Sequence, residues 1–163
     1  MKLSGGVEWA LHCCVVLTAA TEPVPAARLA QLHDVSPSYL AKQMQALSRA
    51  DLVKSVQGKT GGYVLTKPAA DIAVLDVVQA VDGASPAFVC TEIRQRGPFG
   101  TPPDDCTKAC PIARAMSAAD AAWRASLREV SIADLVGTVE QDSGPDALPA
   151  IGTWLNAANA TDG

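Results

Sequence analysis

Apolar residues recur along this chain at the spacing of amphipathic helices, and only one segment alternates as strands do. The first helix is expected over residues 3–20, which are mostly apolar and are followed by prolines. A short second helix is expected over residues 26–32 and a third over residues 37–50. The apolar positions of the third helix lie four and three residues apart, at Leu40, Met44 and Leu47.

The segment between the second and third helices predicts a tight turn at His33-Asp34-Val35. Ser36 is a favourable N-cap, and Pro37 suits the first position of a helix. Two short helices joined in this way are typical of a helix-turn-helix.

A β-hairpin is expected directly after these helices. Residues 52–56 and 63–66 alternate as strands on either side of the glycine-rich run from Gly58 to Gly62. We interpret this hairpin as the wing of a winged helix-turn-helix.

Further helices are expected after the hairpin, over residues 71–81, 110–130 and 132–140. Residues 83–105 form an irregular segment, and a loop of this length is usually functional or disordered. The longest helix carries an apolar stripe at Ile112, Met116, Ala119, Trp123, Leu127 and Val130. We interpret it as a dimerisation helix, with packing onto the rest of the chain as the alternative.

The predicted fold is therefore mainly α with a small β wing: a winged helix-turn-helix followed by a long dimerisation helix. Residues 1–67 form the expected DNA-binding region, and residues 68–140 contain the long loop and the dimerisation helices. Residues 141–163 form a C-terminal tail with one apolar patch around Ile151, Trp154 and Leu155.

Composition is consistent with one soluble globular domain. The chain has 163 residues, of which 48% are hydrophobic and 18% charged, and this excludes a disordered or fibrous protein. Its longest apolar stretch, from Trp9 to Ala20, is too short for a membrane helix. Glu8 precedes that stretch, where a signal peptide needs positive charge, so we expect a cytoplasmic protein.

Charge is divided unevenly along the chain. Residues 1–67 hold seven Lys and Arg against four acids, whereas residues 68–163 hold six against thirteen. The first part therefore has a net charge of +3 and the second −7. A basic first part can contact a polyanion such as DNA, although a chance fluctuation would also produce this difference.

Five cysteines are present: Cys13, Cys14, Cys90, Cys106 and Cys110. An odd number without a secretory signal argues against a disulfide framework and favours buried thiols, metal ligands or a redox site. We expect Cys13 and Cys14 to be core thiols. Cys106 and Cys110 lie at the start of the longest helix, where the helix dipole favours thiolates.

The segment from Ser36 to Thr66 resembles the recognition helix and wing of the IscR/NsrR-type winged-helix transcription regulators. The shared features are a serine N-cap, a Tyr-Leu pair early in the helix, leucines repeated along the helix, a Leu-Val pair after it and a Gly-Gly-Tyr sequence in the second wing strand. The resemblance extends over residues 1–140, with departures at Asp51 and Gln57. It implies a homodimer that binds partly palindromic promoter DNA, and many members of the family sense through an iron-sulfur cluster.

The start of the recognition helix supplies the residues expected to read base edges in the major groove, namely Ser36, Ser38, Tyr39, Lys42 and Gln43. A second group surrounds them and is expected to contact the DNA backbone. This group comprises Arg28, Lys54, Lys59 and Thr60.

A metal site needs partners for Cys106 and Cys110, and the first helix offers Glu8 and His12, four residues apart on one face. The resemblance implies that an acidic residue at the position of Glu8 can be a cluster ligand. These four residues form the preferred set, around a 2Fe-2S cluster, and zinc fits the same four. The alternative set replaces His12 by Cys90 around a 4Fe-4S cluster, although Cys90 departs from the family spacing.

The predicted function is a homodimeric DNA-binding regulator that senses redox state through a 2Fe-2S cluster. Trp9 lies beside Glu8 and would transmit a change at the cluster to the DNA-binding helices. The alternatives are a cluster-free repressor that responds to thiol oxidation or a small ligand, a 4Fe-4S sensor of nitric oxide or oxidants, and an electron-transfer protein. No catalytic motif is present, so no enzyme is expected.

Overall fold

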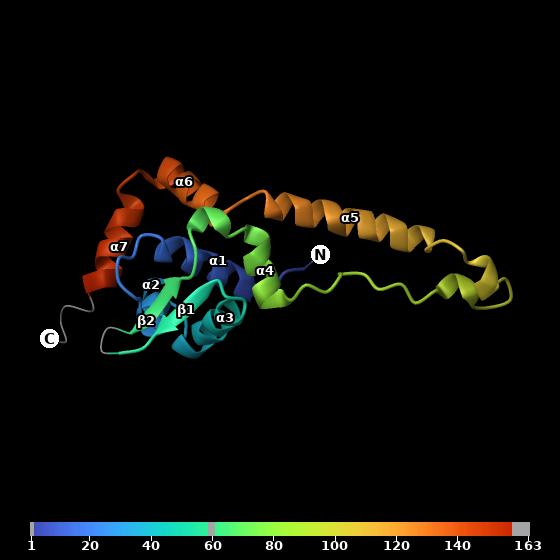
Figure 1. Ribbon diagram of the computed structural model, residues 1–163, viewed down its shortest axis with the longest axis horizontal. Coiled ribbons are helices and arrows are strands. Elements are labelled where there is room, and N and C mark those ends of the chain that lie inside the picture. Colours follow the sequence, from blue (N-terminus) through green and yellow to red (C-terminus); the bar gives the residue numbers. More distant parts are fainter. Residues whose placement is uncertain (1, 59–60, 158–163) are drawn as a thin grey trace.

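The computed structural model describes residues 2–58 and 61–157. Figure 1 shows a helical body with one long arm, which consists of α5 and the loop that precedes it. The expected class, mainly helical with a small two-stranded antiparallel sheet, is confirmed. No helix in the described part of the chain is long and apolar enough to cross a membrane.

The body is built around α1 (Gly5–Leu17), which begins and ends inside the predicted range. Apolar side chains on nearly all sides of α1 are buried, because α3, α4, α6 and α7 all contact it. This burial on several sides explains why α1 is mostly apolar although it is too short to span a membrane. Cys13 and Cys14 are fully buried here, as expected for core thiols, and burial raises the pKa of each to about 12.

The helix-turn-helix consists of α2 (Ala26–Leu32) and α3 (Pro37–Arg49). The Ser36 hydroxyl accepts a hydrogen bond from the Tyr39 amide at 3.2 Å, so Ser36 caps α3 as predicted. The apolar stripe of α3 is fully buried at Leu40, Met44 and Leu47. Local capping and helical periodicity therefore specify this unit.

The wing pairs β1 (Val53–Val56) with β2 (Gly62–Leu65) in an antiparallel register, with Val53 opposite Leu65. Val24, just before α2, exchanges two backbone hydrogen bonds with Tyr63 of β2 at 2.8 and 3.0 Å. Gly62 is required at this point, because a Cβ there would collide with the backbone of Val24. The wing is thus fixed to the helix-turn-helix.

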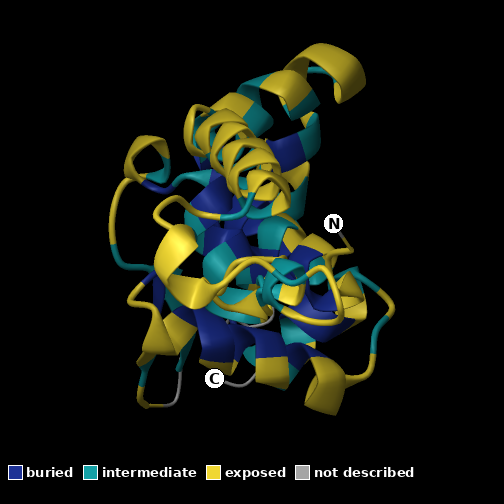
Figure 2. Cartoon of the chain, turned by 90° about the vertical axis from the view of Figure 1, so that its right-hand side faces the viewer, coloured by how far each residue is buried: buried dark blue, intermediate teal, exposed yellow. Residues whose placement is uncertain are grey.

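A short 3-10 helix, η1 (Ala69–Asp71), leads from the wing to α4 (Val74–Asp82). The arm then begins with an extended loop that contains two more 3-10 turns, η2 (Ile93–Gln95) and η3 (Pro103–Asp105). It returns through α5 (Pro111–Arg128), which is about 27 Å long at 1.5 Å per residue. Figure 2 views the molecule toward the arm and shows mostly exposed residues in front of the buried core.

Only the C-terminal end of α5 packs on the body, where Trp123 and Leu127 contact the Val7, Val74 and Val78 cluster. No residue of α5 is buried in the isolated chain. Ile112 and Met116, nearer the tip, are 65% and 42% exposed. The alternative of simple packing onto the rest of the chain therefore accounts for one end of the stripe and leaves the other uncovered.

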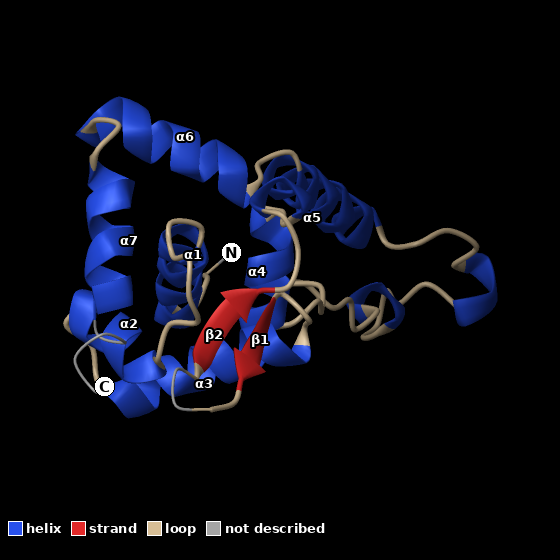
Figure 3. Ribbon diagram, turned by 60° about the vertical axis from the view of Figure 1, so that its left-hand side comes forward, coloured by secondary structure: helices blue, strands red, loops and turns tan. Residues whose placement is uncertain are grey.

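The C-terminal region is more ordered than the predicted tail. Helix α6 (Ile132–Ser143) extends past the expected end at residue 140, and α7 (Ala147–Ala157) follows. Pro149 does not prevent α7, because it lies in the first turn, where its missing N–H is not needed. Figure 3 shows α7 running beside α1 and α6 crossing near one end of α1, and Leu148 and Leu155 of α7 join the main core.

Candidate functional site

The N-terminal turn of α3 presents polar side chains to solvent. Ser36, Ser38 and Lys42 are exposed, and Tyr39 is 39% exposed. Lys54 is exposed on β1 of the wing, beside this helix, whereas Lys59 and Thr60 lie outside the described residues. The exposed residues are polar or basic, as expected of a recognition helix and its wing.

Gln43 does not belong to this surface, contrary to the expectation that it reads bases. Its side chain is only 5% exposed and lies beneath Gly6 of α1. A Cβ on Gly6 would lie 2.6 Å from the Gln43 Oε1 atom, so the two helices pack closely through this pair. The sequence held this signal, because Gln43 shares the helical face of Leu40 and Met44.

Arg28 also has a different role from the expected phosphate contact. Its guanidinium stacks on the Trp154 ring, with the Cζ atom 3.2 Å from the ring centroid. One amino group donates to the Trp154 carbonyl at 2.6 Å, and the other donates to Gln31 at 2.9 Å. The side chain is therefore engaged inside the protein, by a helix that the sequence did not predict.

The face of α1 that carries Glu8 and His12 is exposed to solvent, as a ligand pair requires. Trp9 and His12 both contact His33, with ring centroids 5.9 and 5.6 Å away. His33 caps the C-terminus of α2, so these ring contacts join α1 to the turn of the helix-turn-helix. Burial, and then the nearby His12, lower the pKa of His33. Sequence reasoning missed His33, because nothing local indicates its contact with α1.

Cysteines from both ends of the arm's loop meet near the start of α5. Cys110 is the N-cap of α5, and backbone amides of Ala113 and Ile112 lower the pKa of its thiol. A hydrogen bond from the Cys90 side chain also lowers that pKa. The sequence set Cys90 aside because of its spacing, but the loop folds back and removes this objection.

Arg94 connects the two sides of this cysteine-bearing loop. It forms an ion pair with Glu92 at 2.7 Å and donates to the Lys108 carbonyl at 2.7 Å. Its positive charge lies close to Cys106 and also favours the thiolate of Cys110. Arg94 thus makes the loop a suitable environment for anionic sulfur ligands. No pattern in the sequence indicates this role of Arg94.

One chain does not bring the whole predicted ligand set together. The loop before α5 and the start of α5 carry Cys90, Cys106 and Cys110 and belong to the arm, whereas α1, which carries Glu8 and His12, lies in the body (Figure 1). Among the described residues, no group of three or more His, Cys, Asp or Glu side chains is arranged to hold a metal ion.

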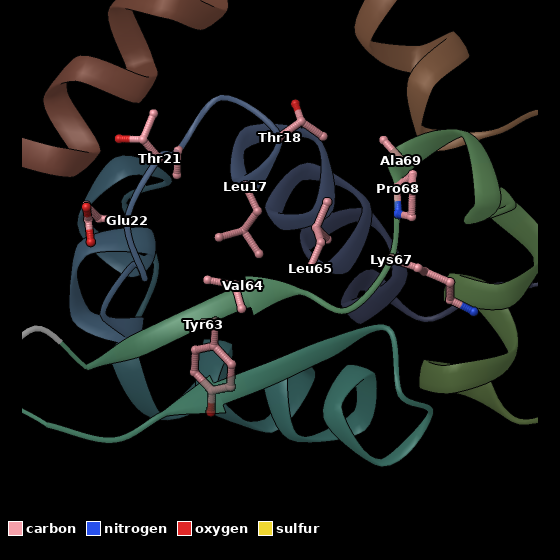
Figure 4. Close-up of a pocket in the computed structure, with 11 residues that line it drawn as sticks. Leu17, Thr18, Thr21, Glu22, Tyr63, Val64, Leu65, Lys67, Pro68 and Ala69 are labelled. Atoms are coloured by element: carbon pink, nitrogen blue, oxygen red, sulfur yellow. The ribbon is translucent and has the colours of Figure 1, made fainter.

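A separate pocket of about 350 Å³ lies between the end of α1 and β2 (Figure 4). Thr18, Thr21 and Glu22 line one side of it, and Tyr63 and Lys67 line the other. None of the predicted DNA-binding or metal-binding residues contributes to its lining.

The family model described as "Iron-dependent Transcriptional regulator", named Rrf2, matches residues 3–138. The chain is 42% identical over 76 residues to the HTH-type transcriptional regulator IscR of Klebsiella pneumoniae, which covers 47% of each protein. It is 31% identical over 137 residues to YffB of Lactococcus lactis, named as an HTH-type transcriptional regulator, across 83% of this chain and 86% of that one. The chain spans about half the length of relatives such as IscR.

Solved structures share the fold. CymR, "the Global Cysteine Regulator of B. subtilis", superposes with a TM-score of 0.65 at 21% identity, over 85% of this chain and 98% of that one. IscR of T. potens superposes with a TM-score of 0.60 at 20% identity, over 87% and 90% of the two chains. With an exposed recognition helix, a wing and a match over most of its length, the chain belongs to the Rrf2 family of transcriptional regulators.

Proposed function

We propose that this DNA-binding regulator is a cytoplasmic homodimer that senses redox state through a 2Fe-2S cluster. The observation that carries the proposal is the position of Cys110 as the N-cap of α5, where helix amides and the nearby Cys90 side chain lower the pKa of its thiol. Two adjacent sulfurs in such an environment suit an iron ligand pair. When bound, the cluster would accept and release one electron, and a histidine ligand would favour its reduced form.

We prefer Cys90 to Cys106 as the partner of Cys110. The preference for Cys106 rested on sequence spacing, whereas the Cys90 side chain is near enough to Cys110 to lower the pKa of its thiol. We therefore propose Cys90, Cys110, Glu8 and His12 as the ligands. Cys106 lies close to Arg94 and serves as the comparison residue in the experiment below.

A second copy of the chain would complete this ligand set. Within one chain the cysteines and α1 are separated by the length of the arm (Figure 1). The arm also leaves Ile112 and Met116 exposed, which is unfavourable for an isolated helix in water. Pairing two arms would cover this stripe and would carry the cysteines of one subunit toward α1 of the other.

Helix α1 provides a path from the ligands to the recognition helix. Glu8 and His12 lie on the same helix as Gly6, which packs tightly against Gln43 of α3. On the neighbouring face, Trp9 contacts His33 at the end of α2. A shift of α1 would therefore be felt by both helices of the DNA-binding unit, and Trp9 would be part of that switch.

The DNA-binding surface is tested by separating base contacts from phosphate contacts. Lys42→Ala should lower the preference for operator over random DNA by about tenfold, because a base contact is lost. Lys54→Ala should weaken binding to both DNAs equally and reduce the salt slope by about one. Fluorescence-anisotropy titrations at several salt concentrations measure both effects.

Lys67→Ala is the matched control, since Lys67 is exposed but lies at the end of β2 away from the wing tip. It should behave like the wild type on both DNAs. Unchanged operator preference in Lys42→Ala, with a loss in Lys67→Ala, would show that the DNA-binding surface has been placed wrongly.

A second candidate function is a cluster-free thiol switch. The Cys90–Cys110 contact favours it as well, because adjacent thiols can oxidise to a disulfide. The related fold of Staphylococcus aureus CymR has a structure titled "oxidized form". Iron and sulfide analysis of anaerobically purified protein separates the two functions: a colourless protein without iron that loses two thiols on oxidation would favour the thiol switch.

A further inference from the structure

Helix α7 is an addition to the family core. The family match ends at residue 138, before α7 begins at Ala147. Nevertheless α7 is firmly docked, because Leu148 and Leu155 are buried in the main core. Gly152 is pressed against the Ala19 carbonyl so closely that no larger residue would fit. This close packing makes α7 part of the folded body.

Helix α7 also makes ring and hydrogen-bond contacts with the DNA-binding unit and the loop that leads into it. Trp154 lies under the guanidinium of Arg28 from α2, and its carbonyl accepts a hydrogen bond from the same group at 2.6 Å. Two residues later, Asn156 donates to the Thr21 hydroxyl at 3.0 Å and accepts from the Glu22 amide at 3.4 Å. Both contacts act on α2 and on the loop that leads into it.

Helix α2 depends on such support, because it has only seven residues. A helix of this length is unstable alone in water, so its position is set by what packs against it. Helix α3 contacts α2, and Trp154 of α7 stacks against Arg28, which belongs to α2. The Trp154 contact therefore adds a second element that helps to set the position of α2.

We propose that α7 is a clamp that positions the helix-turn-helix for operator binding, and that Arg28 and Trp154 are its positioning residues. Arg28 acts through α2 and not as a DNA ligand. The proposal rests on the DNA-binding function alone and is independent of the cluster.

Operator binding by the full-length protein tests the clamp. Trp154→Ala should weaken binding about tenfold, and Trp154→Phe should restore it to within about twofold, because phenylalanine keeps a ring under the guanidinium. Hydrogen exchange over residues 26–32 should be faster in Trp154→Ala than in the wild type. Thr153→Ala is the matched control on the exposed face of α7 and should change neither readout.

A double-mutant comparison identifies the partner. Arg28→Ala should weaken binding as much as Trp154→Ala does, and the double variant should be no weaker than either. If Trp154→Ala is too unstable to purify, Asn156→Ala removes the other contact and should weaken binding about threefold with the same exchange signature.

Two results would overturn the clamp. Unchanged operator binding with faster exchange in α2 would show that orientation of α2 does not matter. Tighter binding by Trp154→Ala, with a salt slope steeper by about one, would show that α7 instead withholds Arg28 from a phosphate. A wild-type protein that does not prefer operator over random DNA would instead contradict the proposed DNA-binding surface. That outcome can be told apart from the two results that overturn the clamp.

Discussion

Replacing Cys110 by alanine is expected to abolish the visible absorption and the bound iron of the purified protein. Cys110 caps α5, where amides of Ala113 and Ile112 stabilise its thiolate, and no other cysteine occupies that position. Cys90→Ala should have the same effect, because Cys90 is the side chain beside it. Absorption spectra and iron and sulfide counts on anaerobically purified protein measure the loss.

Cys106→Ala is the matched control, since it removes a cysteine from the same loop. It should retain the spectrum and two irons per subunit if the cluster is of the 2Fe-2S type. A colourless Cys106→Ala together with a coloured Cys90→Ala would restore the ligand set that sequence spacing favoured. Four irons per subunit, lost in both variants, would indicate the 4Fe-4S alternative.

Placing charges on the exposed stripe of α5 is expected to separate the proposed homodimer and to weaken operator binding by roughly 100-fold. The loss is large because two half-sites can no longer be bound by one molecule. The variant is Ile112→Glu with Met116→Glu, and neither side chain is buried in the isolated chain, so its fold should survive. Light scattering after size-exclusion chromatography gives the mass, and anisotropy gives the affinity.

The control carries the same two charges on another face of the same helix, at Ala118 and Ala125, which are also exposed. Ala118→Glu with Ala125→Glu should remain dimeric and bind operator normally. If the stripe variant stays dimeric and the control dissociates, a different face of α5 forms the interface.

The helix-turn-helix could be predicted from sequence because its determinants are local. Ser36 caps the helix four residues before Leu40, and the stripe that follows keeps one helical period. The same period assigns Gln43 to the buried face, so its assignment to DNA overlooked a signal that was present. Polar character alone does not establish exposure, because a glutamine under a glycine fills a close helix crossing.

The contacts that the sequence did not predict join residues that are far apart along the chain. Arg28 meets Trp154 across 126 positions, and no local pattern announces that contact. Cys90 reaches Cys110 only because the loop reverses, so spacing was a poor guide to its role. His33 likewise meets Trp9 through a ring contact between α1 and the end of α2. Tertiary packing, not propensity, decides all three.

The central claim is that the charge of a bound cluster controls operator binding through α1. The direct measurement is an anaerobic titration of operator with the cluster-loaded protein, before and after one-electron reduction, with iron measured afterwards. The two affinities should differ by at least about tenfold, which is within the usual range of allosteric coupling. Trp9→Ala should reduce the difference and leave the visible spectrum in place. Identical titration curves for the two redox states, with iron fully retained in both, would contradict the claim.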